Sequence, residues 1–201
     1  EILRLQKLYA DNEPEKSVKK KKTNAKALKR KARQVKLEKV LHLEKPGGPL
    51  PKDLDPSAKP LTVGAWCTPE SGDGVLVAQG GESTGYSLYL AGGKARFAVR
   101  SGGELKEAVS DLKVEAGKRT HIAGTLAATG KLTVLINGKA VGETPGHLLP
   151  GRPFDGLSVG NDTESLVADY TAPTKLKGSL EDIRIYWGVL NAKGMKAWAS
   201  K

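Results

Sequence analysis

The chain has 201 residues, a net charge of +11 and a hydrophobic content of 38%, which together allow one ordinary packed domain and an extended arm. No apolar run approaches the roughly 18 residues that a membrane-spanning helix needs, and the single cysteine excludes an internal disulfide. The charge is uneven, because residues 1–45 hold 15 Lys and Arg against 6 Asp and Glu, whereas residues 46–201 hold 18 against 16. The basic character therefore gives no indication that the larger, C-terminal part binds nucleic acid.

Two N-terminal segments are predicted to lie outside the main domain. In residues 1–15, apolar side chains recur at helical spacing from Ile2 to Leu8 until Pro14 ends the pattern, which predicts the last helix of an upstream domain. Residues 16–39 are predicted to form a basic, partly helical arm, and a solvated linker is the favoured interpretation. The alternative is an arm that binds a polyanion, either nucleic acid or a sulfated glycan, through Lys19, Lys20, Lys21, Lys22, Lys29, Arg30, Lys31 and Arg33.

Residues 40–201 have a different composition, in which short runs of alternating apolar side chains are separated by turn signals. Asn137-Gly138 falls directly after one such run and predicts a tight hairpin, because both residue types tolerate positive φ. Many short strands with close turns predict an all-β domain, an antiparallel two-sheet jelly-roll sandwich. A short helical turn capped by Asn191 is expected near the C-terminal end. The alternating runs lie at 61–67, 86–90, 95–99, 132–136 and 183–187.

Three stretches of this region resemble laminin-G-like, concanavalin-A-like jelly-roll domains. They are LTVGAWCTPESGDGVLVAQGG, KRTHIAGTLAATGKLTVLINGKAVG, and FDGLSVGND followed by LKGSLEDIRIYWGVLN. The chain departs from the family pattern at Arg119, where Trp is usual, at Leu126-Ala127 in place of Tyr-Asp, and in the order of Glu181-Asp182. The resemblance implies a non-catalytic bacterial module, extracellular or periplasmic, that binds carbohydrate or an extracellular protein.

A second resemblance concerns sulfatases. Cys67-Thr68-Pro69 matches the start of the sulfatase nucleophile motif Cys-x-Pro-x-Arg, but Ser71 stands where the motif has Arg. Cys67 also continues the alternating run that begins at Leu61, so we expect its thiol to be buried in the core rather than reactive. Separately, EILRLQKLYAD resembles the final helix of a bacterial sulfatase domain, which implies that this chain is the C-terminal part of a sulfatase without its catalytic domain.

Catalysis is also disfavoured at the remaining polar residues. His121 lacks a supporting nucleophile and carboxylate motif, and the family resemblance gives it a structural role. Three scattered histidines and one cysteine form no zinc pattern. Glu181 and Asp182 adjoin on an expected strand, so their side chains should face opposite sides, whereas glycoside hydrolysis needs two carboxyl groups at one bond. We expect one of them to pair with Arg184, and glycan hydrolysis stays a less favoured alternative.

Calcium is the one cofactor for which the loops offer ligands. A calcium site takes six to eight oxygen atoms, many of them from backbone and water, so the sequence leaves such a site open. Ordinary turn chemistry is the favoured explanation of these loop residues. The candidate ligands are Asp73, Asn161, Asp162 and Asp169.

Two tyrosines are candidates for stacking on a sugar ring, Tyr89 and Tyr170. Tyr89 alternates with Leu88 and Leu90, so we expect it to face away from the core. The favoured hypothesis is therefore a carbohydrate-binding or extracellular interaction module. Binding of a polyanion by the basic arm is the main alternative.

Overall fold

The computed structural model describes residues 36–171 and 174–201. The helix predicted at 1–15 and the basic residues predicted to bind a polyanion lie outside these residues. The described part forms eleven strands and one short helix, and its first strand begins at Glu38, two residues before the expected domain boundary. No helix in the described ranges is long and apolar enough to span a membrane.

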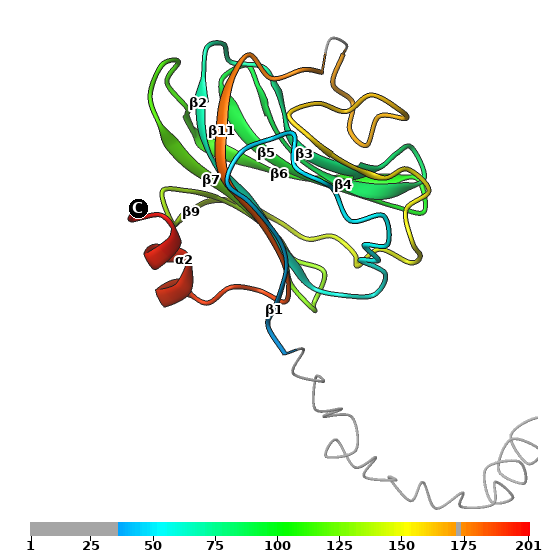
Figure 1. Ribbon diagram of the computed structural model, residues 1–201. Coiled ribbons are helices and arrows are strands. Elements are labelled where there is room, and N and C mark those ends of the chain that lie inside the picture. Colours follow the sequence, from blue (N-terminus) through cyan, green and yellow to red (C-terminus); the bar gives the residue numbers. More distant parts are fainter. Residues whose placement is uncertain (1–35, 172–173) are drawn as a thin grey trace, which may run out of the picture. The chain divides into compact units, whose positions relative to one another are not determined.

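Two antiparallel sheets face each other, which confirms the predicted sandwich (Figure 1). The elements in chain order are β1 (Glu38–Leu43), β2 (Leu61–Pro69), β3 (Gly74–Gly80), β4 (Thr84–Ala91), β5 (Lys94–Ser101), β6 (Glu104–Lys113), β7 (Thr120–Leu126), β8 (Leu132–Ile136), β9 (Lys139–Thr144), β10 (Leu157–Val159), β11 (Gly178–Trp187) and α2 (Ala192–Trp198). The six-stranded sheet has the order β1-β11-β2-β7-β8-β9, and the five-stranded sheet has the order β10-β3-β4-β5-β6. The hairpin predicted at Asn137-Gly138 joins β8 to β9, with φ values of +50° and +76°.

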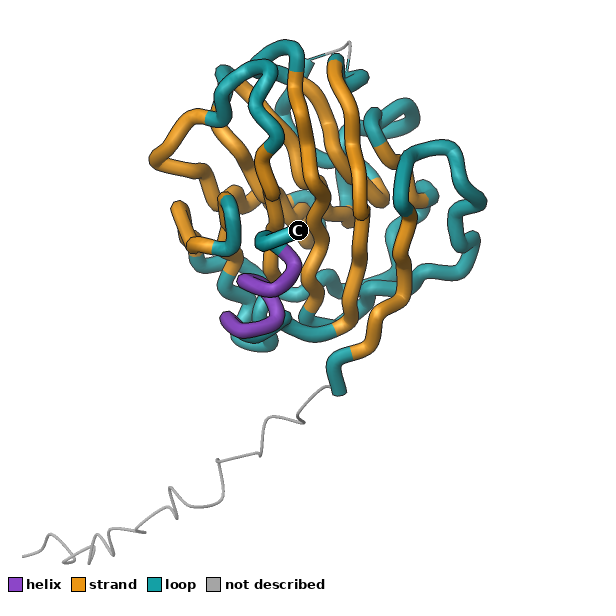
Figure 2. Tube along the Cα trace, turned by 60° about the vertical axis from the view of Figure 1, so that its left-hand side comes forward, coloured by secondary structure: helices purple, strands orange, loops and turns teal. Residues whose placement is uncertain are grey.

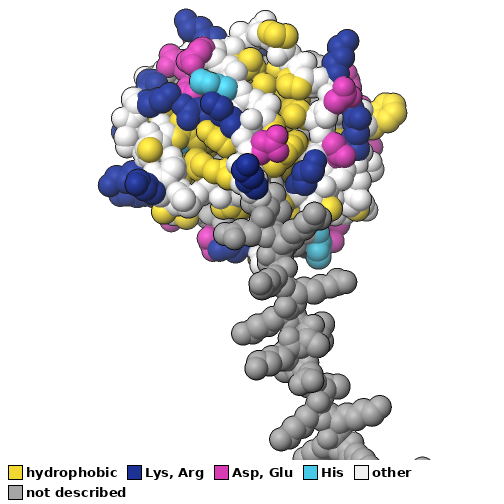
Figure 3. Space-filling model, turned by 60° about the horizontal axis from the view of Figure 1, so that its bottom comes forward, with side chains coloured by type: hydrophobic (Ala, Val, Ile, Leu, Met, Phe, Trp, Pro, Cys, Tyr) yellow, Lys and Arg dark blue, Asp and Glu magenta, His cyan; other side chains and the backbone are white. Residues whose placement is uncertain are grey.

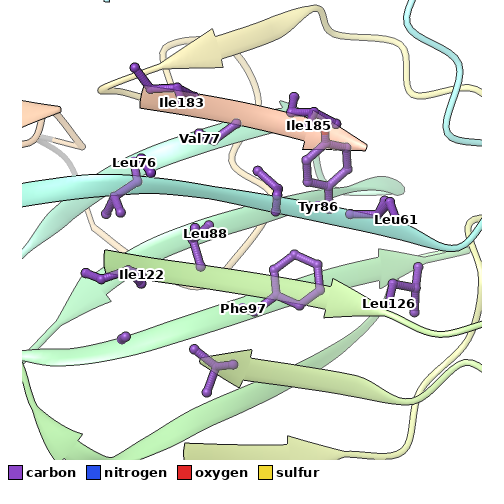
Figure 4. Packing of buried hydrophobic residues seen from close by; sticks show 14 of the residues in the cluster. Leu61, Leu76, Val77, Tyr86, Leu88, Phe97, Ile122, Leu126, Ile183 and Ile185 are labelled. Atoms are coloured by element: carbon purple, nitrogen blue, oxygen red, sulfur yellow. The ribbon is translucent and has the colours of Figure 1, made fainter. Parts of the chain in front are cut away.

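The core lies between the two sheets and takes inward-facing side chains from both (Figure 4). Leu61 and Cys67 of β2 are completely buried there, which confirms the alternating pattern and the prediction for the thiol. Phe97 of β5 enters from the opposite sheet and lies over Gly124 of β7, where a Cβ atom would collide with its ring. Burying each such large side chain contributes about 1.5–3 kcal/mol to stability.

Part of the outer face of the six-stranded sheet is covered by α2 (Figure 2). Asn191 caps this helix by accepting a hydrogen bond of 2.8 Å from the backbone N–H of Gly194, as its residue type predicts. Met195 and Trp198 pack from the helix onto Ala123 and neighbouring residues of the sheet. This cover explains why β2 is buried on both faces rather than on one.

The outer face of the five-stranded sheet is covered by a segment without regular structure. This covering segment consists of residues 160–171 and 174–177. Its side chains Val167 and Ala168 are buried against Val75, Ala78 and Tyr89 of the sheet, in a second apolar cluster separate from the main core. The sandwich therefore has a non-strand layer on each outer face.

Candidate functional site

A hollow of about 520 Å³ opens between the covering segment and the five-stranded sheet, where β3 begins and β4 ends. We call it the outer hollow. The β2–β3 turn, the end of β4 and the covering segment each contribute side chains to it. Ligand pockets in proteins typically measure about 300–1,000 Å³, so the outer hollow is large enough for a small ligand. Its lining includes Asp73, Ala91, Asp169, Tyr170, Lys175 and Lys177.

The covering segment is held in place by Asp162. The backbone N–H of Asp162 donates a 3.0 Å hydrogen bond to Thr174 Oγ1. The Thr174 hydroxyl in turn donates a 2.6 Å hydrogen bond to the backbone carbonyl of Asp162. Its carboxylate accepts bonds from the backbone N–H of Val167, at 3.2 Å, and from the hydroxyl of Tyr170. Burial raises the pKa of Asp162, although the bond from Tyr170 opposes this change. Asp162 therefore fixes the covering segment, which forms one side of the outer hollow.

The four candidate calcium ligands do not share one site. Asp73 and Asp169 line the outer hollow, whereas Asn161 lines a neighbouring hollow of about 230 Å³. One oxygen of Asp73 accepts a 2.8 Å bond from the backbone N–H of Gly92, and Asp169 pairs with Arg100 at 2.7 Å. Calcium binding at these residues stays a prediction.

The two candidate tyrosines have different environments. Tyr89 faces away from the main core as expected, but it is only 3% exposed, because the covering segment lies over it. Its ring meets that of Tyr170 edge to face at 4.8 Å, and its hydroxyl donates to Glu107. Tyr89 thus cannot stack on a sugar, and the expectation of an exposed ring is wrong. Tyr170 is half-buried and lines the outer hollow.

Tyr170 also lines a second hollow, of about 490 Å³. Both hollows include Tyr170 and Asp169 in their linings, and the second adds Glu82 and Arg100. The two hollows therefore adjoin along the covering segment, and together they offer a longer surface than either alone.

Glu181 and Asp182 are placed differently from the expectation for a regular strand. The register of β11 shifts after Glu181, and Asp182 has a φ of +48°, so a bulge interrupts the alternation. Glu181 pairs with Arg119 at 3.2 Å, and Arg119 lies over Trp66. Both acidic side chains therefore lie on the outer side covered by α2, and the expectation of opposite faces is wrong.

Asp182 forms a compact ion-pair cluster. Both of its oxygens accept bonds of 2.6 Å from Arg184, which confirms the predicted pairing, and His42 Nε2 lies 2.9 Å from one of them. Burial would raise the pKa of Asp182, but the bonds from Arg184 and Lys201 outweigh it and lower the pKa. A carboxyl group held ionised in this way does not fit a general acid.

His42, Asp182 and Glu44 are also the only group of three or more His, Cys, Asp or Glu side chains, among the described residues, whose ligand atoms gather within 4.8 Å. Arg184 and Lys201 already neutralise Asp182. The cluster is therefore explained as an ion-pair network that holds β1 and β11 together.

Neither Cys67 nor His121 has the environment of a catalytic group. Burial raises the pKa of Cys67 to about 12, so the group is a neutral thiol at physiological pH. His121 is completely buried between Trp66 and Trp198, at ring distances of 5.5 and 4.6 Å. Burial lowers its pKa to about 4, and neither ring nitrogen has a hydrogen-bond partner among the described residues. His121 is a packing residue.

The surface of the described part shows mixed charge on the face drawn in Figure 3. Hydrophobic side chains gather near its centre, and Lys and Arg side chains are spread around them together with Asp and Glu.

Sequence reasoning missed Lys175 and Lys177 in the outer hollow. The signal was present in the alternation of Thr174, Lys175, Leu176 and Lys177, in which Thr174 and Leu176 are buried and the two lysines are exposed. Such alternation indicates an extended segment with one buried side. The sequence does not tell which surface that side packs against.

Two facing antiparallel sheets of six and five strands place the domain among the jelly-roll β-sandwiches. The chain belongs to the concanavalin A-like lectin/glucanases superfamily, whose Laminin_G_3 model matches residues 46–194. This match confirms the family predicted from the sequence. A comparison with curated protein sequences finds no match.

Several solved structures share the fold. The CBM40 domain of the IT-sialidase from Ruminococcus gnavus is 14% identical, with a TM-score of 0.60 over 82% of this chain and 97% of that one. A heptameric SAP-like pentraxin from Limulus polyphemus is 16% identical, with a TM-score of 0.56 and 82% of each chain covered. Domain 4 of AbnA, a GH43 extracellular arabinanase from Geobacillus stearothermophilus, is 20% identical, with a TM-score of 0.55 over 72% of this chain and 68% of that one. At these identities the likeness establishes the fold alone.

Proposed function

We propose that this chain is a non-catalytic carbohydrate-binding module and that the outer hollow is its sugar-binding site. The observation that carries the proposal is the composition of the hollow. Tyr170 and Ala91 supply apolar surface, and Asp73 and Thr171 supply groups that can bond to sugar hydroxyls. A few polar groups around an apolar surface are typical of small-molecule sites.

The similar structures support a carbohydrate as the ligand class. The CBM40 domain from Ruminococcus gnavus has been solved with α2,3 sialyllactose, and Domain 4 of AbnA has been solved with arabinotriose. The adjoining hollow beside Tyr170 gives this chain room for more than one sugar ring. An oligosaccharide is therefore a better candidate than a single sugar.

Residues elsewhere in the domain also favour binding without hydrolysis. Each carboxylate of the adjacent pair Glu181 and Asp182 is held by an arginine, and the thiol of Cys67 is buried. We further propose that the module acts outside the cytoplasm and is appended to a larger hydrolase, for which a sulfatase is the candidate parent. The sequence directly upstream of Glu1 tests the parent, since a Cys-x-Pro-x-Arg motif is expected there.

A glycan array followed by calorimetric titration tests the function. We compare the unchanged protein with Ala91→Phe, which places a ring in the hollow, and with Ala140→Phe, which places the same ring on exposed β9. Ala91→Phe should weaken glycan binding by tenfold or more, which corresponds to about 1.4 kcal/mol, while Ala140→Phe should have no effect. Equal binding by both variants would place the site elsewhere. Absence of binding to any glycan, with or without Ca²⁺, would refute the function.

A further inference from the structure

Backbone hydrogen bonds hold the stretch that carries Lys175 and Lys177, the two lysines of the outer hollow. The carbonyl of Thr174 accepts a 2.9 Å bond from Val75, and the backbone N–H of Leu176 donates a 2.9 Å bond to Gly160. The carbonyl of Lys177 accepts a 2.8 Å bond from the backbone N–H of Glu70. Because Leu176 is buried between them, Lys175 and Lys177 both project from the exposed side of this stretch, where both line the hollow.

Neither lysine is neutralised within the described residues. No carboxylate of that part of the chain lies within 4.0 Å of either ammonium group, whereas Asp169 is already paired with Arg100. Asp73 is the remaining acidic group of the lining. The lining of the outer hollow therefore holds two lysines and two aspartates, and because Asp169 is paired with Arg100 from outside this lining, only Asp73 offsets the positive charges of Lys175 and Lys177.

We propose that the outer hollow selects an acidic saccharide, whose carboxylate or sulfate group binds Lys175 and Lys177. The inference rests on the proposed function, and it names the ligand class of the same site. The sugar ring lies against Tyr170 and Ala91, and Asp73 accepts hydrogen bonds from its hydroxyl groups. Hydrogen bonds that involve a charged partner are stronger than neutral ones, so the anionic group provides the selectivity.

Matched ligands separate the charge from the shape of the sugar. The probes are digalacturonate, its methyl ester, and a galactose disaccharide with and without a 6-sulfate. The methyl ester keeps the ring and removes the charge. We expect at least one charged probe to bind about tenfold or more tightly than its neutral counterpart, and we expect its affinity to fall as salt is added. The uronate and sulfate arms identify which anionic group is preferred.

Two matched double variants test whether the charged probe binds at Lys175 and Lys177. Lys175→Gln/Lys177→Gln removes two charges from the hollow, and Lys193→Gln/Lys196→Gln removes two exposed charges from α2 on the opposite face. The first variant should lose the preference for the charged probe, while its affinity for the neutral probe and its melting temperature stay unchanged. The second should behave like the unchanged protein.

The outcomes distinguish the two proposals. Equal affinity for the charged and neutral probes, or an unaltered preference in Lys175→Gln/Lys177→Gln, would overturn the acidic ligand and leave a neutral carbohydrate as the ligand class. Loss of the preference in both variants would assign it to overall charge and overturn the site. Failure of every probe, together with an array that binds no glycan, would remove both proposals.

Discussion

Acidification should destabilise the domain through His121. The folded protein holds the pKa of this buried imidazole at about 4, against 6.5 for the unperturbed group, because burial disfavours its charged form. Arg184 and Arg119 act in the same direction, and Asp182 opposes them. The unfolded chain therefore binds more protons between these two values, so stability is complete above pH 6.5 and is lost as the pH falls toward 4. Between pH 7.5 and pH 5 the loss should be about 2 kcal/mol.

Urea unfolding at a series of pH values measures this loss. His121→Phe keeps an aromatic ring between Trp66 and Trp198 and removes the titration. Its stability should fall by about 2 kcal/mol less than that of the unchanged protein over the same interval. All other titratable groups are common to both proteins, so the difference between the two curves isolates His121. Parallel curves would show that His121 is not buried as a neutral group, and would refute the account of α2 packing.

Two further predictions concern the core and the arm. Gly124→Ala should reduce the free energy of unfolding by about 1–3 kcal/mol, because the added methyl group collides with the Phe97 ring. Chemical denaturation measures it, and Gly156→Ala, where a Cβ meets nothing within 4 Å, is the control. Deletion of residues 1–35 should leave the melting temperature unchanged, because β1 begins at Glu38. The same deletion should weaken salt-sensitive binding to heparin if the basic arm binds polyanions, and an unchanged affinity would exclude that role.

The sandwich was predictable because its strands keep a period of two. Leu61 and Cys67 face inward as their positions in the alternation require, and Asn137-Gly138 turns as its residue types allow. A period of two separates the faces of a strand, but it does not tell whether the outer face is solvated or covered by another part of the chain. Tyr89 was assigned to the correct face and the wrong environment for that reason.

The site was less predictable because it depends on local irregularity and long-range packing. The bulge at Asp182 shifts the alternation of β11 by one residue, so that Leu180 before it and Ile183 after it both enter the core. Asp73, Asp169 and Tyr170 were identified as candidates by residue type, but only the packing of the covering segment brings them to one hollow. The same packing places Lys175 and Lys177 in the lining of the hollow.

The bonds between Asp162 and Thr174 have a consequence for how this module could diversify. They fasten the covering segment near its two ends, while Val167 and Ala168 hold its middle against the sheet. Evolution or a protein engineer could therefore exchange exposed residues of the hollow, such as Lys175 and Lys177, to alter ligand preference, while these attachments stay in place. The arrangement separates the part of the sequence that folds the protein from the part that chooses its ligand.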